Sequence, residues 1–208
     1  MNIILLTIIA LVSYFLGGVN GAIIISQAAY GRDIRNYGSG NAGANNMLRV
    51  HGGGAALMVV LVDVGKSVIA VLIGNWLFGY AGYPVVGKLF AGFCLMLGHL
   101  FPVFYQLKGG RGVICGAVTV FLVDWKVGLV CLGIFVVELA ALRYVSLGSI
   151  LGAIAFPIAI WLMPGHTSLE AALSLCSALL VIFKHSDNIG RLVTGRESKI
   201  SVGSRKDS

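Results

Sequence analysis

Residues 35–54, "RNYGSGNAGANNMLRVHGGG", form a polar segment in a chain that is otherwise mostly apolar. A connector between two apolar segments needs few polar groups, so this density indicates a binding site. Gly38, Gly40 and Gly43 let the backbone turn and present N–H groups to an anion, and Arg49 adds a planar charged fork. We therefore predict a phosphate site here. The alternative is a glycine-rich hairpin that only joins two helices. The neutral polar side chains of the segment are Ser39, Asn41, Asn45 and Asn46.

A second polar segment, Lys108-Gly109-Gly110-Arg111-Gly112, precedes an apolar run. Free N–H groups at a helix start, flexible glycines and two cations predict a second anion site. The GxxxxGK[ST] spacing of a nucleotide-binding loop is absent, which disfavours ATP. The alternative is a basic flank that only follows the membrane surface. His99, upstream, fits either a packed helix residue or a pocket donor, and we favour the first.

Two further segments carry polar groups. Arg143 and Ser146 share a short connector, and the tail holds His185, Asn188 and Arg191, with Glu197 beyond. Residues three apart share one face of a helix, so the tail predicts a third wall of the site. The alternative is a basic segment held against anionic lipid.

The composition is that of a membrane protein. Hydrophobic residues make up 58% of the 208 residues, charged residues only 11%, and the mean hydropathy is +0.93, whereas about a quarter of the residues of a soluble domain are charged. We predict an all-α integral membrane protein with one domain, residues 1–208. Seven apolar runs predict about seven transmembrane helices, and an alternative of six merges the short fourth and fifth runs. The runs are 3–27, 55–78, 85–105, 113–123, 127–142, 147–163 and 169–183.

Lysine and arginine predict the orientation. With seven crossings, most of them fall on one face, which places the N-terminus outside and the C-terminus in the cytoplasm. The net charge of +7 is thus explained by topology and ligand, and no nucleic acid is predicted. The cytoplasmic parts are loops at about 30–54, 105–112 and 143–146 and the tail 184–208. Their basic residues are Arg32, Arg35, Arg49, Lys108, Arg111, Arg143, Lys184, Arg191, Arg196, Lys199, Arg205 and Lys206.

Other reactive residue types give weaker signals. Asp63 and Lys66 are three apart in one apolar run and Glu138 lies in another; buried charges in a membrane are usually paired or functional, and we favour a structural ion pair. The cysteines occur singly, so no metal, disulfide or cofactor is predicted. They are Cys94, Cys115, Cys131 and Cys176.

Taken together, these segments resemble the acyl-phosphate-dependent glycerol-3-phosphate acyltransferases of bacteria. The matching stretches are "GSGNAGANN" with "LRV", "GHLFPVFYQLKGGRGV" and "HSDNIGRLVTGRESK", supported by "LVDVGKS" and "RYVSLGS". Three departures stand out: Asn45 replaces a usual threonine, Arg111 replaces a usual lysine, and Ile114-Cys115 replace a small residue and a threonine. Arg111 keeps the charge but exchanges a point cation for a fork.

The resemblance implies transfer of a fatty acyl group from acyl phosphate to the 1-hydroxyl of glycerol 3-phosphate, giving lysophosphatidic acid and inorganic phosphate. It also implies a bacterial inner-membrane enzyme of phospholipid biosynthesis that contacts membrane lipid, with its active site on the cytoplasmic face. The predicted catalytic residues are Ser39, Lys108, His185 and Asn188. The predicted substrate-binding residues are Gly40, Asn41, Gly43, Asn46, Arg49, Gly109, Gly110, Arg111, Gly112, Arg143, Ser146, Arg191 and Glu197.

Within this assignment, Lys108, the N–H groups of Gly109 to Gly112, and Arg49 would hold glycerol 3-phosphate, and Ser39, Asn41, His185 and Asn188 the acyl phosphate. The proton acceptor is open between His185 and the substrate's own phosphate, with His51 the other cytoplasmic imidazole. No HxxxxD pair is present, unlike in acyltransferases that use acyl-CoA. The rival function is a carrier or channel for a small organophosphate, which predicts anion-binding groups on both faces; here they crowd one.

Overall fold

The computed structural model describes residues 3–200, which form a bundle of helices. Arg205 and Lys206, two of the basic residues that predict the membrane orientation, lie outside the described residues. Residues 1–2 and 201–208 of the predicted domain 1–208 also lie outside them. The α-helices are α1 Ile3–Gly18, α2 Gly21–Tyr30, α3 Ala44–His51, α4 Gly53–Gly79, α5 Pro84–Leu100, α6 Val113–Val123, α7 Trp125–Ala141, α8 Val145–Leu162, α9 Ser168–Lys184 and α10 Ser186–Val193. Two 3-10 turns, η1 Ile34–Asn36 and η2 Val103–Tyr105, lie in the loops.

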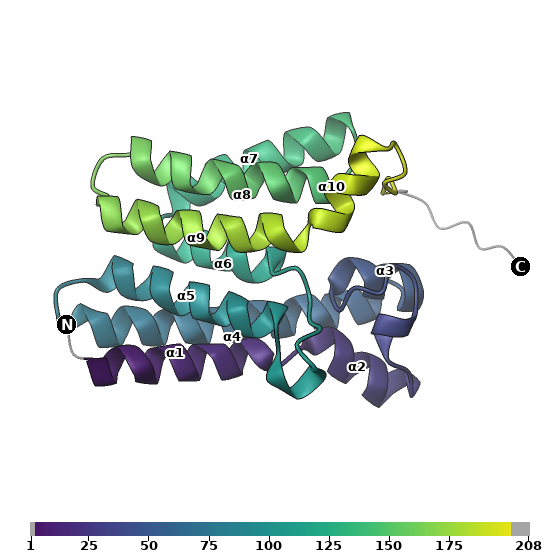
Figure 1. The fold of residues 1–208 in the computed structure, drawn as a ribbon, viewed down its shortest axis with the longest axis horizontal. Helices are drawn as coiled ribbons and strands as arrows, with labels where there is room; N and C mark the ends of the chain where they lie inside the picture. Colours follow the sequence, from purple (N-terminus) through teal and green to yellow (C-terminus); the bar gives the residue numbers. More distant parts are fainter. Residues whose placement is uncertain (1–2, 201–208) are drawn as a thin grey trace, which may run out of the picture.

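The long helices run side by side along the bundle, and the short helices α2, α3 and α10 gather at one end of it (Figure 1). Residues 3–30, α4, residues 84–105 and α8 are long and apolar enough to cross a membrane. The pair α9 and α10, bent by 59°, would be a fifth span, and α6 is a shorter apolar helix. The protein is thus a multi-pass integral membrane protein.

The predicted runs 113–123 and 127–142 form two separate helices, α6 and α7, and not the merged run of the alternative. They break at Asp124, whose side chain caps α7 by accepting a hydrogen bond from the Lys126 N–H. Phe121 of α6 packs directly on Gly128 of α7, where a Cβ atom would collide with the ring. The chain therefore turns back on itself here.

The first apolar run is broken, contrary to the single helix predicted over 3–27. α1 ends at Gly18 and α2 begins at Gly21, with Asn20 as its N-cap, accepting from the Ile23 N–H at 3.1 Å. The carbonyls left free at the end of α1 are bound by Lys66 of α4, at 3.2 Å from Gly17 O and 2.8 Å from Val19 O. The break is therefore stabilised by a partner that is distant in sequence.

Glycines let α5 approach its neighbours closely. A Cβ atom at Gly98 would collide with the Tyr14 carbonyl of α1, and one at Gly87 would collide with the Gly74 carbonyl of α4. Small residues at such crossings allow helix backbones to pack in a membrane, where the hydrophobic effect gives no driving force between helices. The central helix α5 is thereby fixed against both α1 and α4, and its C-terminal end, with His99, is placed at the end of the bundle where the polar segments meet.

Candidate functional site

A polar cleft of about 590 Å³ lies beside α3 and α10. Segments far apart in the sequence line it: the first polar segment, the N-terminal turns of α6 and α8, and the tail. The polar or glycine residues that line the cleft are Gly38, Ser39, Asn41, Gly43, Asn45, Arg49, Asp63, His99, Arg111, Gly112, Ser146, Ser149, His185, Asn188, Arg191, Glu197 and Ser198.

Asn46 shapes the first polar segment. Its Nδ2 donates to the carbonyls of Ile34 at 3.2 Å and Tyr37 at 3.0 Å, and its Oδ1 accepts from the Ser39 N–H at 2.8 Å. Gly38 has a φ of +59°, and a Cβ atom there would collide with Asn46 Oδ1. Asn46, a predicted substrate-binding residue, is buried, and its amide is committed to holding the loop that presents Ser39.

In the second segment, two of the backbone N–H groups predicted to bind a phosphate have partners within the protein. The N–H of Gly109 donates to Leu100 O at 3.2 Å, and the N–H of Gly110 donates to His99 O at 3.1 Å. These bonds satisfy carbonyls at the end of α5, where the last turn lacks partners of its own. The N–H groups of Gly109 and Gly110 are thus already used, whereas the first turn of α6, after its N-cap Gly112, has N–H groups without partners inside the helix.

Positive charge converges on the cleft. Arg111 is half-buried there, and burial together with the nearby positive charge of Arg191 lowers the pKa of the Arg111 guanidinium. Arginine stays protonated at neutral pH even so. Arg49 lines the same space. An anion bound in the cleft would relieve the mutual repulsion of these cations.

Glu197 ties the tail to α8. Its carboxylate accepts from Ser146 Oγ at 2.7 Å, Asn188 Nδ2 at 2.6 Å and Arg191 Nε at 2.7 Å. Burial opposes ionisation, but the hydrogen bonds from Ser146, Arg191 and Asn188 outweigh it, so the pKa of Glu197 is lowered. Glu197, itself a predicted site residue, therefore holds three other predicted site residues in place.

His185 has a defined tautomer. Its Nδ1 lies 2.8 Å from the Val181 carbonyl, which can only accept, so Nδ1 carries the proton and Nε2 keeps a lone pair. Burial lowers the pKa of His185, although the bond to Val181 opposes this shift. The imidazole lines the cleft, and the lowered pKa favours its neutral form, which has a proton-accepting nitrogen.

Some predicted residues lie outside the polar cleft. Gly40, Lys108 and Gly109 line an adjacent side hollow of about 420 Å³, together with Arg35 and Lys184. Arg143, predicted to face the site with Ser146, is not among the residues that line the cleft. Its backbone has a φ of +67°, and its carbonyl accepts from the Ile200 N–H at 2.9 Å.

The floor of the cleft holds groups that the sequence did not assign to the site. The predicted ion pair is confirmed, with Lys66 Nζ 2.8 Å from Asp63 Oδ1, and Lys66 Nζ is also 2.8 Å from His99 Nδ1. Asp63 and His99 line the cleft. The sequence feature that could have pointed to Asp63 and Lys66 as site residues is their charge, because charged side chains are rare inside apolar runs.

Asp63, His99 and Cys115 place possible metal-ligand atoms within 4.8 Å of one another. The ammonium group of Lys66 lies against two of these three ligands. It therefore already provides the positive charge that a metal ion would bring. The four cysteines are free thiols.

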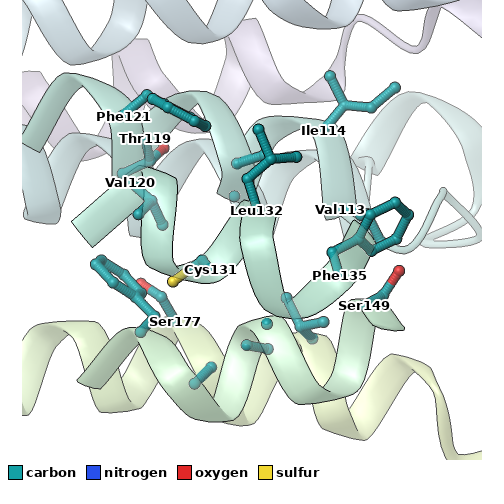
Figure 2. A pocket seen from close by; sticks show the side chains of 18 of the residues that line it. Val113, Ile114, Thr119, Val120, Phe121, Cys131, Leu132, Phe135, Ser149 and Ser177 are labelled. Atoms are coloured by element: carbon teal, nitrogen blue, oxygen red, sulfur yellow. The ribbon is translucent and has the colours of Figure 1, made fainter. Parts of the chain in front are cut away.

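An apolar groove of about 210 Å³ continues from the polar cleft between α6, α7 and α8. The two spaces share Val113, Ile114, Phe135 and Ser149. Figure 2 shows these four side chains at one end of the groove, with Thr119, Val120 and Phe121 at the other. The arrangement offers a charged end for an anion and a long apolar space for a hydrocarbon chain.

Comparisons with known proteins agree with this picture. A family model described as glycerol-3-phosphate acyltransferase matches residues 7–195. A glycerol-3-phosphate acyltransferase from Thermoanaerobacter sp. (strain X514) is 42% identical over 92% of this chain and 93% of its own length. One from Finegoldia magna is 37% identical over 96% and 98%.

Solved structures agree as well. The crystal structure of PlsY (YgiH), an integral membrane glycerol 3-phosphate acyltransferase, in its glycerol 3-phosphate form has a TM-score of 0.84 and 30% identity, covering 94% of this chain and 96% of that one. The lysophosphatidic acid form of PlsY has a TM-score of 0.81 and 28% identity, covering 94% and 95%.

The Glu197 cluster predicts a pH-dependent stability. Because the pKa of Glu197 is lowered in the folded protein, its contribution is complete above the unfolded pKa of roughly 4.3 and is lost as the pH falls through the folded pKa. We expect Glu197→Gln to lower the melting temperature at neutral pH by several degrees, since hydrogen bonds to charged groups contribute about 1.5–3 kcal/mol each, and to flatten the acid fall. The measurement is thermal unfolding in detergent from pH 3.5 to 7.5.

The matched control is Asp187→Asn, which makes the same chemical change at an exposed carboxylate of the same tail. Because Asp187 lies in the first turn of α10 and accepts none of the three hydrogen bonds of Glu197, Asp187→Asn should lower the melting temperature less than Glu197→Gln does. Equal melting curves for the Glu197→Gln variant and the wild type at neutral pH would contradict the role of Glu197.

Proposed function

The chain belongs to the glycerol-3-phosphate acyltransferase family, and from this premise we propose that the polar cleft is its active site, where an acyl phosphate and glycerol 3-phosphate lie side by side. The protein is an integral membrane acyltransferase that acylates glycerol 3-phosphate in phospholipid synthesis. The acyl phosphate donor, the residue roles and the membrane orientation are our proposals.

The observation that carries the proposal is the continuity of the polar cleft with the apolar groove. An acyl phosphate has a doubly charged head and a long hydrocarbon tail, and these two spaces suit its two ends. An apolar lining keeps the tail away from the water of the polar cleft, where each exposed CH₂ group would cost about 0.8 kcal/mol. The head would then sit beside the shared residues Val113 and Ser149, at the mouth of the cationic cleft.

The charged groups suggest how two phosphates are held. Arg49, Arg111 and the N–H groups of the first α6 turn would neutralise glycerol 3-phosphate, in place of the N–H groups of Gly109 and Gly110, which bind α5. Ser39, Asn41 and Asn188 would hydrogen-bond the acyl phosphate, as predicted from the sequence. We place Lys108 at the entry to the cleft, because it lines the side hollow next to it.

The chemistry needs little covalent help from the protein, because an acyl phosphate is a mixed anhydride and already activated. The 1-hydroxyl oxygen attacks the acyl carbon, the bond from that carbon to the phosphate oxygen breaks, and phosphate leaves with the bonding pair. Holding the hydroxyl close to the carbonyl and neutralising the leaving phosphate supply the rate. The hydroxyl proton passes to Nε2 of His185 or to a phosphate oxygen of the substrate, and these two routes differ in their pH dependence.

We also propose the membrane arrangement expected from the sequence: about seven crossings, the N-terminus outside, and the cleft on the cytoplasmic face of a bacterial inner membrane. The basic residues Arg49, Arg111 and Arg191 all line the cleft, and lysine and arginine favour the cytoplasmic side. On that face the cleft also meets glycerol 3-phosphate from the cytoplasm. The rival carrier function would need anion-binding groups near both faces of the bundle.

A reconstitution assay tests the function. Purified protein in lipid nanodiscs, given palmitoyl phosphate and glycerol 3-phosphate, should form lysophosphatidic acid and release phosphate in equal amounts. Replacing palmitoyl phosphate with palmitoyl-CoA should give no product. Uptake of labelled glycerol 3-phosphate into sealed proteoliposomes without any acylated product would instead support the carrier.

A second test identifies the proton acceptor. If Nε2 of His185 accepts the proton, the wild-type rate should fall as acidification protonates the imidazole, and because its pKa is lowered this fall should lie below the ordinary value of about 6.5. His185→Gln should then lose roughly 10²- to 10⁴-fold in rate and lack this acid fall. A loss of the same factor at every pH would assign the proton to the substrate phosphate and leave His185 a binding role.

A third test concerns the apolar groove. Gly152 lies on its wall, and the nearest atom to an added Cβ is the Cys131 carbonyl oxygen at 3.5 Å, so a larger side chain would occupy the groove itself. Gly152→Leu should reduce turnover of palmitoyl phosphate relative to decanoyl phosphate by about tenfold or more. Gly133→Leu on α7, which meets no atom within 4 Å, is the control and should leave the ratio unchanged. An unchanged ratio in both variants would place the acyl chain elsewhere.

A further inference from the structure

His99 is a buried imidazole at the floor of the polar cleft, and the reaction as described gives it no role. Only 3% of the residue is exposed, yet it lines the cleft. It stands near the end of α5, just before the loop that carries the second polar segment. A polar group buried at the edge of a ligand space needs a partner for each of its nitrogens.

Lys66 determines which nitrogen of His99 carries the proton. An ammonium group has three N–H donors and no acceptor. Lys66 directs them to Gly17 O at 3.2 Å, Val19 O at 2.8 Å and His99 Nδ1 at 2.8 Å. Nδ1 therefore accepts, which leaves the proton of the neutral ring on Nε2. Asp63, whose Oδ1 is 2.8 Å from Lys66 Nζ, balances the charge of the lysine.

The Nε2 atom is left without a hydrogen-bond partner among residues 3–200. It lies against Gly110, where an added Cβ atom would collide with it. Only a residue without a side chain leaves this nitrogen uncovered. The Gly110 N–H is itself bound to the His99 carbonyl, so the loop is fixed in a position that keeps Nε2 open.

Resting on the proposed function, we propose that His99 is a further substrate-binding residue of the acyl transfer, whose Nε2–H donates to a phosphate oxygen at the floor of the cleft. Lys66 and Asp63 act through it as positioning residues that fix its tautomer. The charges of Lys66 and Asp63 cancel at the floor of the cleft. The floor therefore contributes a directed donor, the Nε2–H of His99, and the arginines at the walls contribute the positive charge. A phosphate oxygen is the acceptor that suits a cationic cleft.

Two isosteric substitutions separate this role from packing. In His99→Asn the amide occupies the region of Nδ1, next to Lys66, and the donor toward the cleft is lost. In His99→Gln the amide nitrogen reaches the region of Nε2 and can restore that donor. We expect His99→Asn to raise the KM for glycerol 3-phosphate or for palmitoyl phosphate at least tenfold, with a smaller change in kcat, and His99→Gln to recover most of it.

The substrate whose KM rises identifies the phosphate that His99 holds. If the two variants are equally impaired, or if the KM values are unchanged, His99 is a packing residue and the proposal is wrong. Wild-type enzyme that makes no lysophosphatidic acid would instead overturn the proposed function, so the two failures are distinguishable.

A spectroscopic readout avoids the risk that a variant misfolds. In wild-type protein with ¹⁵N-labelled histidine, His99 should show a protonated Nε2 and an unprotonated Nδ1, and the Nε2 resonance should shift when glycerol 3-phosphate or inorganic phosphate is added. Lys66→Met should lose the fixed tautomer. A protonated Nδ1 in the wild-type protein, or an Nε2 resonance that neither anion shifts, would overturn the proposal.

Discussion

The burial of one ammonium group, that of Lys66, connects most of the structure that the site needs. An unpaired charge between apolar helices is too costly to persist, so every donor of the group must find an acceptor. Lys66 meets this demand with Gly17 O and Val19 O from the end of α1, with His99 of α5 and with the charge of Asp63. It thereby stabilises the break between α1 and α2 and fixes three helices beneath the cleft.

Above this floor, the polar segments are held by their own hydrogen bonds. Asn46 binds three backbone groups of its loop, and the N–H groups of Gly109 and Gly110 close the end of α5. Glu197 binds side chains of α8 and the tail. Arg191 pairs with Glu197, but Arg49 and Arg111 have no anionic partner among residues 3–200, so their charge remains available to a phosphate. This division between rigid frame and uncompensated charge is the preorganisation that electrostatic catalysis requires.

Much of this architecture follows from the sequence, because apolar runs and residue spacing are local properties. The runs predicted helices, the three-residue spacing predicted the Asp63–Lys66 pair, and His185, Asn188 and Arg191 indeed line one cleft. The break after Gly18, the role of Asn46 and the position of Lys108 in the side hollow could not be predicted, since each depends on a contact between distant segments. Glycine N–H groups look free in a sequence until the carbonyls of another helix are placed beside them.

The two histidines of the cleft show why residue type alone does not define chemistry. Val181 offers His185 a carbonyl, which forces the proton onto Nδ1 and leaves Nε2 as an acceptor. Lys66 offers His99 a donor, which forces the proton onto Nε2 instead. Each ring is oriented by one neighbour that can only accept or can only donate a hydrogen bond. An acyl transfer can use both a group that takes the hydroxyl proton and donors that hold phosphate oxygens. In our proposals the same type of side chain, placed against opposite neighbours, offers one of each.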